Sequence, residues 1–244
     1  ITVVAGGMTL FDRAVSLQPL QTYRDSIAYS GPGEAFEIRV GDLLRYSSAD
    51  EQNQNLERPI RENDAFNWES PNGLVVDARE RVRQRDAAGA LESYRAALRG
   101  DPTLLPALSG AAELHIRKLE YDSAVAYAKR GLAIDAYDPE TNYFYGLAQR
   151  FRGRPYDAKD GLGIASRSPS YRVAALMQLS EMACVERRWG DAADFALRAS
   201  EADAAHVPSL QLLALLARRS GDSTAAVGYL DRISALDPLS HFAR

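Results

Sequence analysis

Five alanines recur at one fixed spacing, and this feature constrains the fold more than any other in the sequence. Ala90, Ala124, Ala158, Ala192 and Ala226 each lie 34 residues after the one before. A period of this length is typical of repeats in which each unit is a pair of antiparallel helices. Such a unit buries its apolar face only against its neighbours, so the sequence predicts a helical solenoid.

Three further columns keep the same period. In the register set by the alanines, the repeats begin at Pro71, Leu105, Pro139, Val173 and Val207. Position eight is small in every repeat: Ala78, Ala112, Gly146, Ser180 and Ala214. Position twenty-seven is small in all but the last: Ala97, Gly131, Ala165, Ala199 and Ile233. Position four is large and apolar in all but the third: Leu74, Leu108, Asn142, Leu176 and Leu210. Large residues opposite small ones let helices interlock at native density, so these columns predict the packing faces.

Prolines and glycines mark the ends of the expected helices. Asp101-Pro102, Asp138-Pro139 and Asp237-Pro238 lie between one helix pair and the next. Proline can start a helix but cannot continue one, so these positions suit the boundaries between repeats. Gly153 and Gly221 fall at the turn inside a repeat, where glycine commonly ends a helix.

The columns and prolines resemble the tetratricopeptide repeat (TPR) superfamily over roughly residues 71 to 240. A narrower resemblance lies in Tyr137 to Leu147, Ala158 to Gly161, Ser168 to Arg172 and Leu236 to Arg244. These segments look like the C-terminal part of a bacterial family with an upstream β-sandwich domain of unknown function, similar to the sandwiches of carbohydrate-active enzymes. The resemblance implies a mainly α fold: a right-handed α-α superhelix of five TPR helix pairs, preceded by a small β-rich segment.

Residues 1–46 differ from the repeats. Ile1 to Ala5, Met8 to Leu17 and Ala35 to Val40 are rich in β-branched and aromatic residues and are separated by glycine and proline. We expect three or four short strands here. The sheet either packs on the first helices of the solenoid or forms the trailing edge of a larger sandwich, and the resemblance favours the second arrangement.

The expected domain organisation has three parts: a β-rich segment in residues 1–46, a connector in 47–70 and the solenoid in 71–244. The connector is polar and lacks periodicity. The sequence opens at Ile1 without a visible targeting signal, so we expect it to be a piece of a larger protein.

Composition narrows the range of partners. With 46% hydrophobic and 25% charged residues, the chain is typical of soluble globular proteins. A net charge of -4 argues against nucleic acid, because phosphate neutralisation needs clustered lysine and arginine. No run of 18 apolar residues is present, so no membrane span is expected. The single cysteine, Cys184, fits a reducing compartment and favours a cytoplasmic location.

The first helix of each TPR pair lines the concave side, and positions two, five, nine and twelve share that face. Its charged, aromatic and long side chains form the candidate groove: Arg79, Glu113, Tyr143, Arg150, Met177, Glu181, Gln211 and Arg218. This mixture could hold an extended peptide or another domain, with Tyr143 as an aromatic platform. The alternative is a plain inner surface of the helical stack.

Catalysis has little support in the sequence, and we expect no catalytic residues, metal site or cofactor. His115, His206 and His241 lie in different repeats or at the chain end, outside any metal-binding pattern. His115 is predicted to be a hydrogen-bonded core residue. Cys184 is predicted to be a small buried hydrophobe.

Two functional hypotheses follow. The first is a scaffold that binds a protein, either its own upstream domain or another polypeptide. The alternative is the non-catalytic C-terminal part of a carbohydrate-active enzyme whose active site lies in an upstream β-sandwich. Self-association is a further expectation, because no extra helix follows the last pair and the apolar Leu230 and Ile233 would need another surface.

Overall fold

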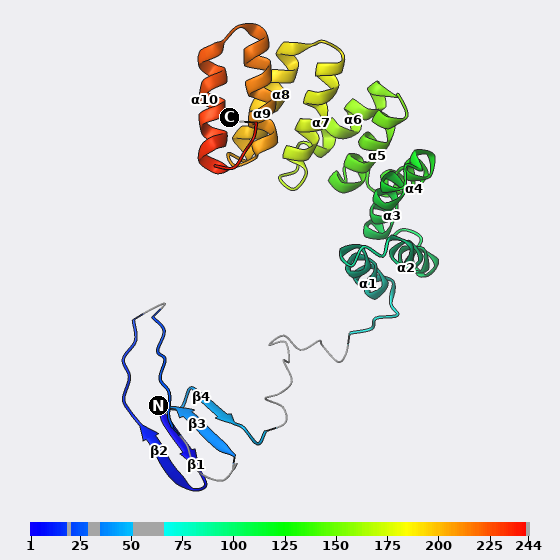
Figure 1. Ribbon diagram of the computed structural model, residues 1–244. Coiled ribbons are helices and arrows are strands. Elements are labelled where there is room, and N and C mark those ends of the chain that lie inside the picture. The colour runs from blue at the N-terminus through cyan, green and yellow to red at the C-terminus, as the bar shows by residue number, and fades with distance from the viewer. Residues whose placement is uncertain (19–20, 29–34, 51–65, 243–244) are drawn as a thin grey trace. The chain divides into compact units, whose positions relative to one another are not determined.

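The computed structural model describes residues 1–18, 21–28, 35–50 and 66–242. The chain divides into two compact units, Ile1–Asp64 and Ala65–Arg244. The first contains strands and the second contains helices (Figure 1). Each unit is described separately below.

The first unit is a four-stranded antiparallel sheet with the order β2-β1-β3-β4. Its strands are β1 (Thr2–Ala5), β2 (Met8–Asp12), β3 (Phe36–Val40) and β4 (Leu44–Ser47). Gly6 and Gly7, both with positive φ, make the two-residue turn between β1 and β2, as the φ values of such hairpin turns require. The expected small β-rich segment is therefore present.

One face of this sheet is apolar. Val3 and Ala5 are buried within the unit, and Val3 pairs with Ile38 across β1 and β3. An open hollow of about 280 Å³ on the unit is lined only by apolar side chains: Val3, Leu10, Ile27, Phe36 and Ile38. The alternation of apolar and charged residues along β3 thus sorts them to opposite faces, as the period of a strand dictates.

The second unit consists, within residues 66–242, of ten helices in five antiparallel pairs that follow one another along an arc (Figure 1). The first helices are α1 (Pro71–Arg83), α3 (Leu105–Arg117), α5 (Pro139–Phe151), α7 (Arg172–Val185) and α9 (Val207–Ser220). The second helices are α2 (Ala87–Gly100), α4 (Tyr121–Ile134), α6 (Pro155–Ala165), α8 (Trp189–Ala202) and α10 (Ser223–Leu236). Each second helix packs on its own first helix, and α2, α4, α6 and α8 also pack on the next one along the chain.

Side-chain caps fix where several helices begin. Ser70, Asp86, Asp138 and Asp222 each accept a hydrogen bond from the backbone N–H three residues on, at 2.7 to 3.0 Å. This bond satisfies a donor that the first turn of a helix leaves free. The His206 side chain caps α9 in the same way, accepting from the Ser209 N–H at 3.3 Å. The three capped first helices, α1, α5 and α9, also have proline at one of their first two positions.

The small residues of the repeat lie where helices approach most closely. Four of the five period-setting alanines have no exposed surface, and Ala226 is 3% exposed. At Gly146 an added Cβ would lie 2.8 Å from Leu162 Cγ and 2.9 Å from the carbonyl oxygen of Ala158. Helices α5 and α6 could not pack this closely around a larger residue.

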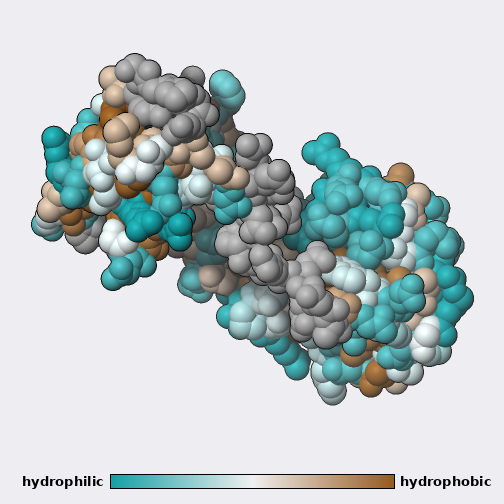
Figure 2. Space-filling view, turned by 90° about the horizontal axis from the view of Figure 1, so that it is seen from below, coloured by the Kyte–Doolittle hydropathy of each residue, from teal (hydrophilic) through white to brown (hydrophobic). Residues whose placement is uncertain are grey.

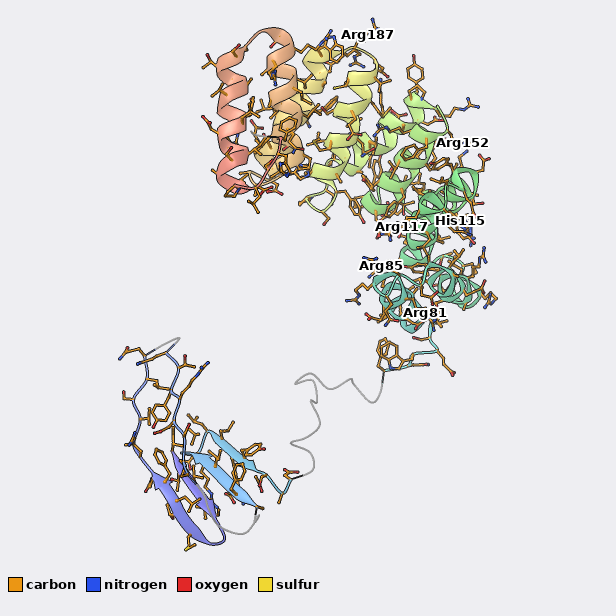
Figure 3. All side chains as sticks on the ribbon, in the orientation of Figure 1. Arg81, Arg85, His115, Arg117, Arg152 and Arg187 are labelled. Atoms are coloured by element: carbon orange, nitrogen blue, oxygen red, sulfur yellow. The ribbon has the colours of Figure 1, made fainter. Side chains whose placement is uncertain are left out.

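Every repeat turns between its helices through one residue with positive φ. These residues occupy the same position of each repeat: Arg85, Leu119, Gly153, Arg187 and Gly221, with φ of 61° to 84°. Arg85 and Arg187 lie at such turns, between α1 and α2 and between α7 and α8 (Figure 3). The two predicted glycine stops are confirmed, and the other three turns hold residues that this conformation does not favour.

Polar groups link the two helices of the first pair in addition to their apolar core. Asp77 Oδ2 accepts hydrogen bonds from Ser93 Oγ at 2.6 Å and from Arg81 Nε at 2.7 Å. Arg81 also contacts Asp86 at 3.2 Å, and it lies on α1 near the turn (Figure 3). Asp77 and Arg81 are thus half-buried members of a network that links α1 to α2.

The last pair differs from expectation at Ile233. This side chain is fully buried where α10 packs on α9, and Leu230 is half-buried. Ile233 therefore needs no further surface, which corrects the basis given above for self-association. Within residues 66–242, the large apolar side chains exposed at this end are Leu215, Val227, Leu236, Leu239 and Phe242.

Candidate functional site

The groove residues come from four first helices whose side chains act on one another across repeats. Arg79 lies on α1, Glu113 on α3, Tyr143 and Arg150 on α5, and Glu181 on α7. The charges of Glu181, Arg150 and Glu113 all act on the Tyr143 hydroxyl. Arg79 acts by its charge on Glu140, which lies on the same helix as Tyr143. Five of the eight predicted residues thus lie near one another, and we call them the groove cluster.

An ion pair joins α5 to α7 on one side of Tyr143. Arg150 Nη1 lies 2.8 Å from Glu181 Oε2 and also donates to the side-chain amide of Gln178. The Arg150 side chain is 22% exposed, so part of this contact is shielded from water. Such a pair fixes the position of both charges more firmly than a fully exposed one would.

Aromatic rings form the centre of the groove cluster. The Tyr143 ring centroid lies 5.3 Å from that of Tyr171 and 5.4 Å from that of Phe144, which it meets edge-on. Such tilted arrangements are favourable between aromatic rings. Burial raises the pKa of the Tyr143 hydroxyl, and the charge of Glu181 raises it further. The hydroxyl therefore stays protonated at neutral pH and remains a hydrogen-bond donor.

Glu140 is an additional member that the sequence analysis did not name. Burial raises the pKa of its carboxyl, and Asp138 adds to the shift. The charge of Arg79 opposes this shift in pKa, and the nearby hydroxyls of Tyr171 and Ser109 oppose it as well. Glu140 is therefore a carboxyl that its neighbours stabilise only in part. It occupies position two of the third repeat, on the face already assigned to the groove, so that position was the signal for it.

Tyr94 and Tyr171 also belong to the groove cluster, although neither lies on a first helix. Tyr94, on α2, is 3% exposed, and its hydroxyl is under the influence of Arg79, Glu113 and Glu140. Its ring fits against α3 because Gly110 lacks a side chain: an added Cβ would lie 2.3 Å from Tyr94 Cζ. Tyr171 directly precedes α7. Burial and the Glu140 carboxyl raise the pKa of Tyr171 far above its usual value.

Three predicted residues lie apart from this cluster. Met177 is 8% exposed and packs in the core against Leu176 and Ala199, because its helix turns that position toward α8. Gln211 is half-buried and Arg218 is exposed, both on α9. In the described part of the chain, none of the three shares an ion pair or side-chain hydrogen bond with the cluster.

Hydrophobic and hydrophilic residues are interspersed on the face seen in Figure 2. Seen from below the view of Figure 1, hydrophobic residues form separate brown patches among hydrophilic ones (Figure 2). The groove cluster itself combines carboxylates, guanidinium groups and tyrosine hydroxyls around aromatic rings. This combination suits hydrogen bonding to a polar chain with side chains of mixed character.

The groups that could suggest catalysis have other roles. His115 is 4% exposed, its Nδ1 lies 2.6 Å from Glu120 Oε2, and its ring stacks on Tyr127 at 5.2 Å. The prediction of a hydrogen-bonded core histidine is confirmed. The pKa of the Cys184 thiol is raised by burial and then by Glu181, so the thiolate is disfavoured. Among the described residues, no three histidine, cysteine or acidic side chains are grouped as metal ligands.

No helix within the described ranges combines the length and apolar character that a membrane crossing requires.

Comparison with known proteins identifies the fold. No protein-family model and no curated protein matches the sequence. Among solved structures, PilF of Pseudomonas aeruginosa matches with a TM-score of 0.61 and 19% identity, over 72% of this chain and 80% of that one. A thermophilic TPR protein of Thermus thermophilus, TTC0263, matches with a TM-score of 0.56 and 15% identity, over 72% and 95%. YrrB, described as a TPR protein with an unusual peptide-binding site, gives 0.54 and 19%, over 72% and 91%.

The helical unit has the tetratricopeptide repeat fold. Its five helix pairs and the TPR structures that match it support the assignment made from the 34-residue period. At 15% to 19% identity these structures show the fold alone.

Proposed function

We propose that this chain is a TPR interaction module whose groove cluster binds a protein. The observation that carries the proposal is the cluster itself, in which side chains from α1, α3, α5 and α7 act on common neighbours. A surface without a ligand is not expected to hold a carboxyl such as Glu140, whose burial its neighbours offset only in part, beside three partly or fully buried tyrosines. Ligand sites, in contrast, often hold polar groups whose pKa is perturbed by burial.

The partner we favour is another domain of the same polypeptide. The narrower sequence resemblance supports a multidomain bacterial protein with a β-sandwich ahead of the TPR unit. The β unit adds a second argument, because the apolar hollow lined by Val3, Phe36 and Ile38 is suited to face another apolar layer. We therefore propose that residues 1–46 are the end of a larger sandwich, that 47–70 connect it to the solenoid, and that 71–244 form the solenoid.

The second candidate function rests on the same apolar sheet face. If the sandwich belongs to a carbohydrate-active enzyme, this chain is its non-catalytic C-terminal part. That candidate predicts glycan hydrolysis by the whole protein, with activity unchanged by variants in the groove cluster. It further predicts that the chain alone binds no glycan.

The test is a calorimetric titration of the purified chain with the upstream portion of its own protein, with glycans as a parallel titrant. We expect binding at micromolar concentration that is weakened by Glu140→Gln and Tyr143→Ala. Tyr156→Ala is the matched control, because Tyr156 lies on the second helix α6 with 84% of its surface exposed. Absence of binding would overturn the upstream partner, and equal affinity of all variants would overturn the groove cluster as its site.

A further inference from the structure

The second helices carry an arginine and aromatic arrangement that occurs twice. On α4, the Arg130 guanidinium stacks over the Tyr127 ring, 5.6 Å from its centroid. On α8, the Arg198 guanidinium stacks over the Phe195 ring at 5.8 Å. Both members of the second pair lie 68 residues after those of the first, which is two repeats.

A second arginine completes each arrangement, again at this spacing. Arg99 lies in the last turn of α2 and lines a hollow of about 290 Å³ together with Arg95, Leu98, Tyr127 and Arg130. Arg167 follows α6, 68 residues after Arg99. With Arg198 it lines two adjoining hollows of about 350 and 560 Å³, one of which also contains Phe195. We call these two sites the outer pockets.

Positive charge exceeds negative charge in the lining of the outer pockets. In residues 66–242, Glu201 is the one carboxylate that lines the second pocket, where it lies beside Arg167, Arg172 and Arg198. In the second pocket, Lys159 and Arg188 both pair with Glu186, at 2.7 and 3.3 Å. In the first, Arg95 pairs with Glu92 at 3.0 Å. Among the described residues, Arg99, Arg130 and Arg167 form no ion pair, and Arg198 has only an exposed contact with Asp194 at 3.6 Å. Within the described ranges, Arg99 and Arg130 of the first pocket and Arg167 of the second thus lack an ion-pair partner, and Arg198 has only this long, exposed contact.

The other two junctions between repeats show that this is not a property of every TPR pair. At the junction of the second and third repeats, the corresponding positions hold Ala133, Gly161 and Ile164. At the junction of the fourth and fifth, Tyr229 and Arg232 are present, but Glu201 replaces the second arginine. Both arginines are therefore present at two of the four junctions between repeats. Each of these two junctions has a hollow that both arginines line.

We propose that the two outer pockets bind oxyanions, namely acidic side chains of a partner polypeptide. An arginine that lies over a ring can still present an N–H edge, and such an edge together with the second arginine of the pocket suits a carboxylate or a phosphoryl group. Arg130 Nη2 also donates to the carbonyl oxygen of Pro102, at 3.4 Å. A polypeptide fits better than nucleic acid, because the pockets are separate and the chain carries a net charge of -4. This inference goes beyond the proposed function, since it concerns the second helices. The side chains involved are positively charged, whereas Glu140 of the groove cluster is a carboxyl.

The test follows each pocket by the Nε–Hε NMR signals of its arginines. The probes are inorganic phosphate, a glutamate-rich peptide and the same peptide with phosphoserine, which separate the sources of the oxyanion. We expect the peptides to shift the signals of all four arginines. Loss of one charge-assisted hydrogen bond weakens binding about tenfold, so Arg99→Gln/Arg130→Gln and Arg167→Gln/Arg198→Gln should each remove binding at their own pocket.

The matched control is Arg232→Gln, which makes the same change beside Tyr229 at a junction without a second arginine. All four pocket arginines are exposed, so the variants are expected to retain helicity by circular dichroism. Peptide binding that survives both double variants, or that falls equally in the control, would overturn the proposal. So would a response to inorganic phosphate without any response to the peptides. Glu140→Gln, which tests the groove, should leave these titrations unchanged.

Discussion

Single residues show where this chain departs from ideal TPR geometry. The turn inside each repeat needs a left-handed residue, and glycine supplies it at Gly153 and Gly221. Leu119, with φ of 62°, adopts the same conformation although its side chain disfavours it. With 71% of its surface exposed, Leu119 gains little from burial in return. The helices on either side therefore impose this conformation on it.

Leu119→Gly is accordingly expected to stabilise the protein. The left-handed conformation costs a non-glycine residue about 1 to 2 kcal/mol, and the extra freedom of glycine in the unfolded chain offsets about 0.5 to 1 kcal/mol of the gain. We expect the free energy of unfolding in urea to rise by about 0.5 to 1 kcal/mol. The control, Gly153→Ala, should lower it. A loss of stability in Leu119→Gly would contradict the account of this turn.

Glu140 gives a second prediction at the residue scale, because its pKa is raised in the folded protein, chiefly by burial. The folded state then binds a proton that the unfolded state has released. The stability from this group is complete below the ordinary pKa of glutamate and is lost as pH rises through the raised pKa. The difference in unfolding free energy between the wild type and Glu140→Gln should therefore fall with pH across that window.

Asp77 provides the control of opposite sign. Hydrogen bonds from Ser93 and then Arg81 lower the pKa of its carboxyl. Its contribution is present above the ordinary pKa of aspartate and is lost as pH falls through the lowered pKa. The wild type minus Asp77→Asn difference should thus rise with pH. Parallel curves for the two substitutions would contradict the opposite environments assigned to these carboxyls.

At the scale of elements, the close approach of paired helices is set by residues without bulk. Gly146 on α5 and Gly161 on α6 face each other: a Cβ added at Gly161 would lie 2.8 Å from the Asn142 carbonyl oxygen and 3.1 Å from the Gly146 nitrogen. These neighbours are backbone atoms, which cannot move aside as a flexible side chain can. The separation of the two helices would have to increase.

Gly146→Ala is expected to destabilise the protein despite the better helix propensity of alanine. Overpacking of this kind typically costs about 1 to 3 kcal/mol. Gly163→Ala, in the adjoining helix α6, is the matched control, because nothing lies within 4 Å of its added Cβ. There, helix propensity alone should raise the unfolding free energy by about 0.5 to 1 kcal/mol. Thermal or urea unfolding of the two variants would test this difference of sign.

The helices were predictable from the sequence because every repeat packs its two helices through the same pattern of small and large side chains. The columns of small and large residues determine which faces meet, and the period carries them from one pair to the next. The members of the groove cluster were harder to predict from the sequence. Glu140 shares a face with Tyr143 and could have been found there, whereas Tyr94 reaches the groove from a second helix only because Gly110 leaves room. Tyr171 precedes α7, and periodicity does not indicate which way such a residue points.

At the scale of the whole molecule, two surfaces with different chemistry belong to different sets of helices. First helices supply most of the groove cluster, with Glu113, Glu140 and Glu181 as its carboxylates. Second helices and the turn after α6 supply the outer pockets, with Arg99, Arg130, Arg167 and Arg198. Among the described residues, no ion pair or side-chain hydrogen bond joins the two sets. Each surface can therefore be altered by substitution with little direct effect on the other.

The stability of the solenoid should also vary along the chain, since among the described residues the main contacts of each helix pair are with the pairs next to it in sequence. Asp77→Ala removes the carboxylate that joins α1 to Ser93 of α2 at 2.6 Å. We expect amide hydrogen exchange to become faster in α1 and α2, while α7 to α10 keep their protection, because opening of the first pair leaves the later interfaces intact. Gly146→Ala, in the central pair, should instead affect the pairs on both sides of it. Uniform loss of protection in Asp77→Ala would mean that the five pairs unfold as one cooperative unit, and a change at the groove would then also be felt at the outer pockets.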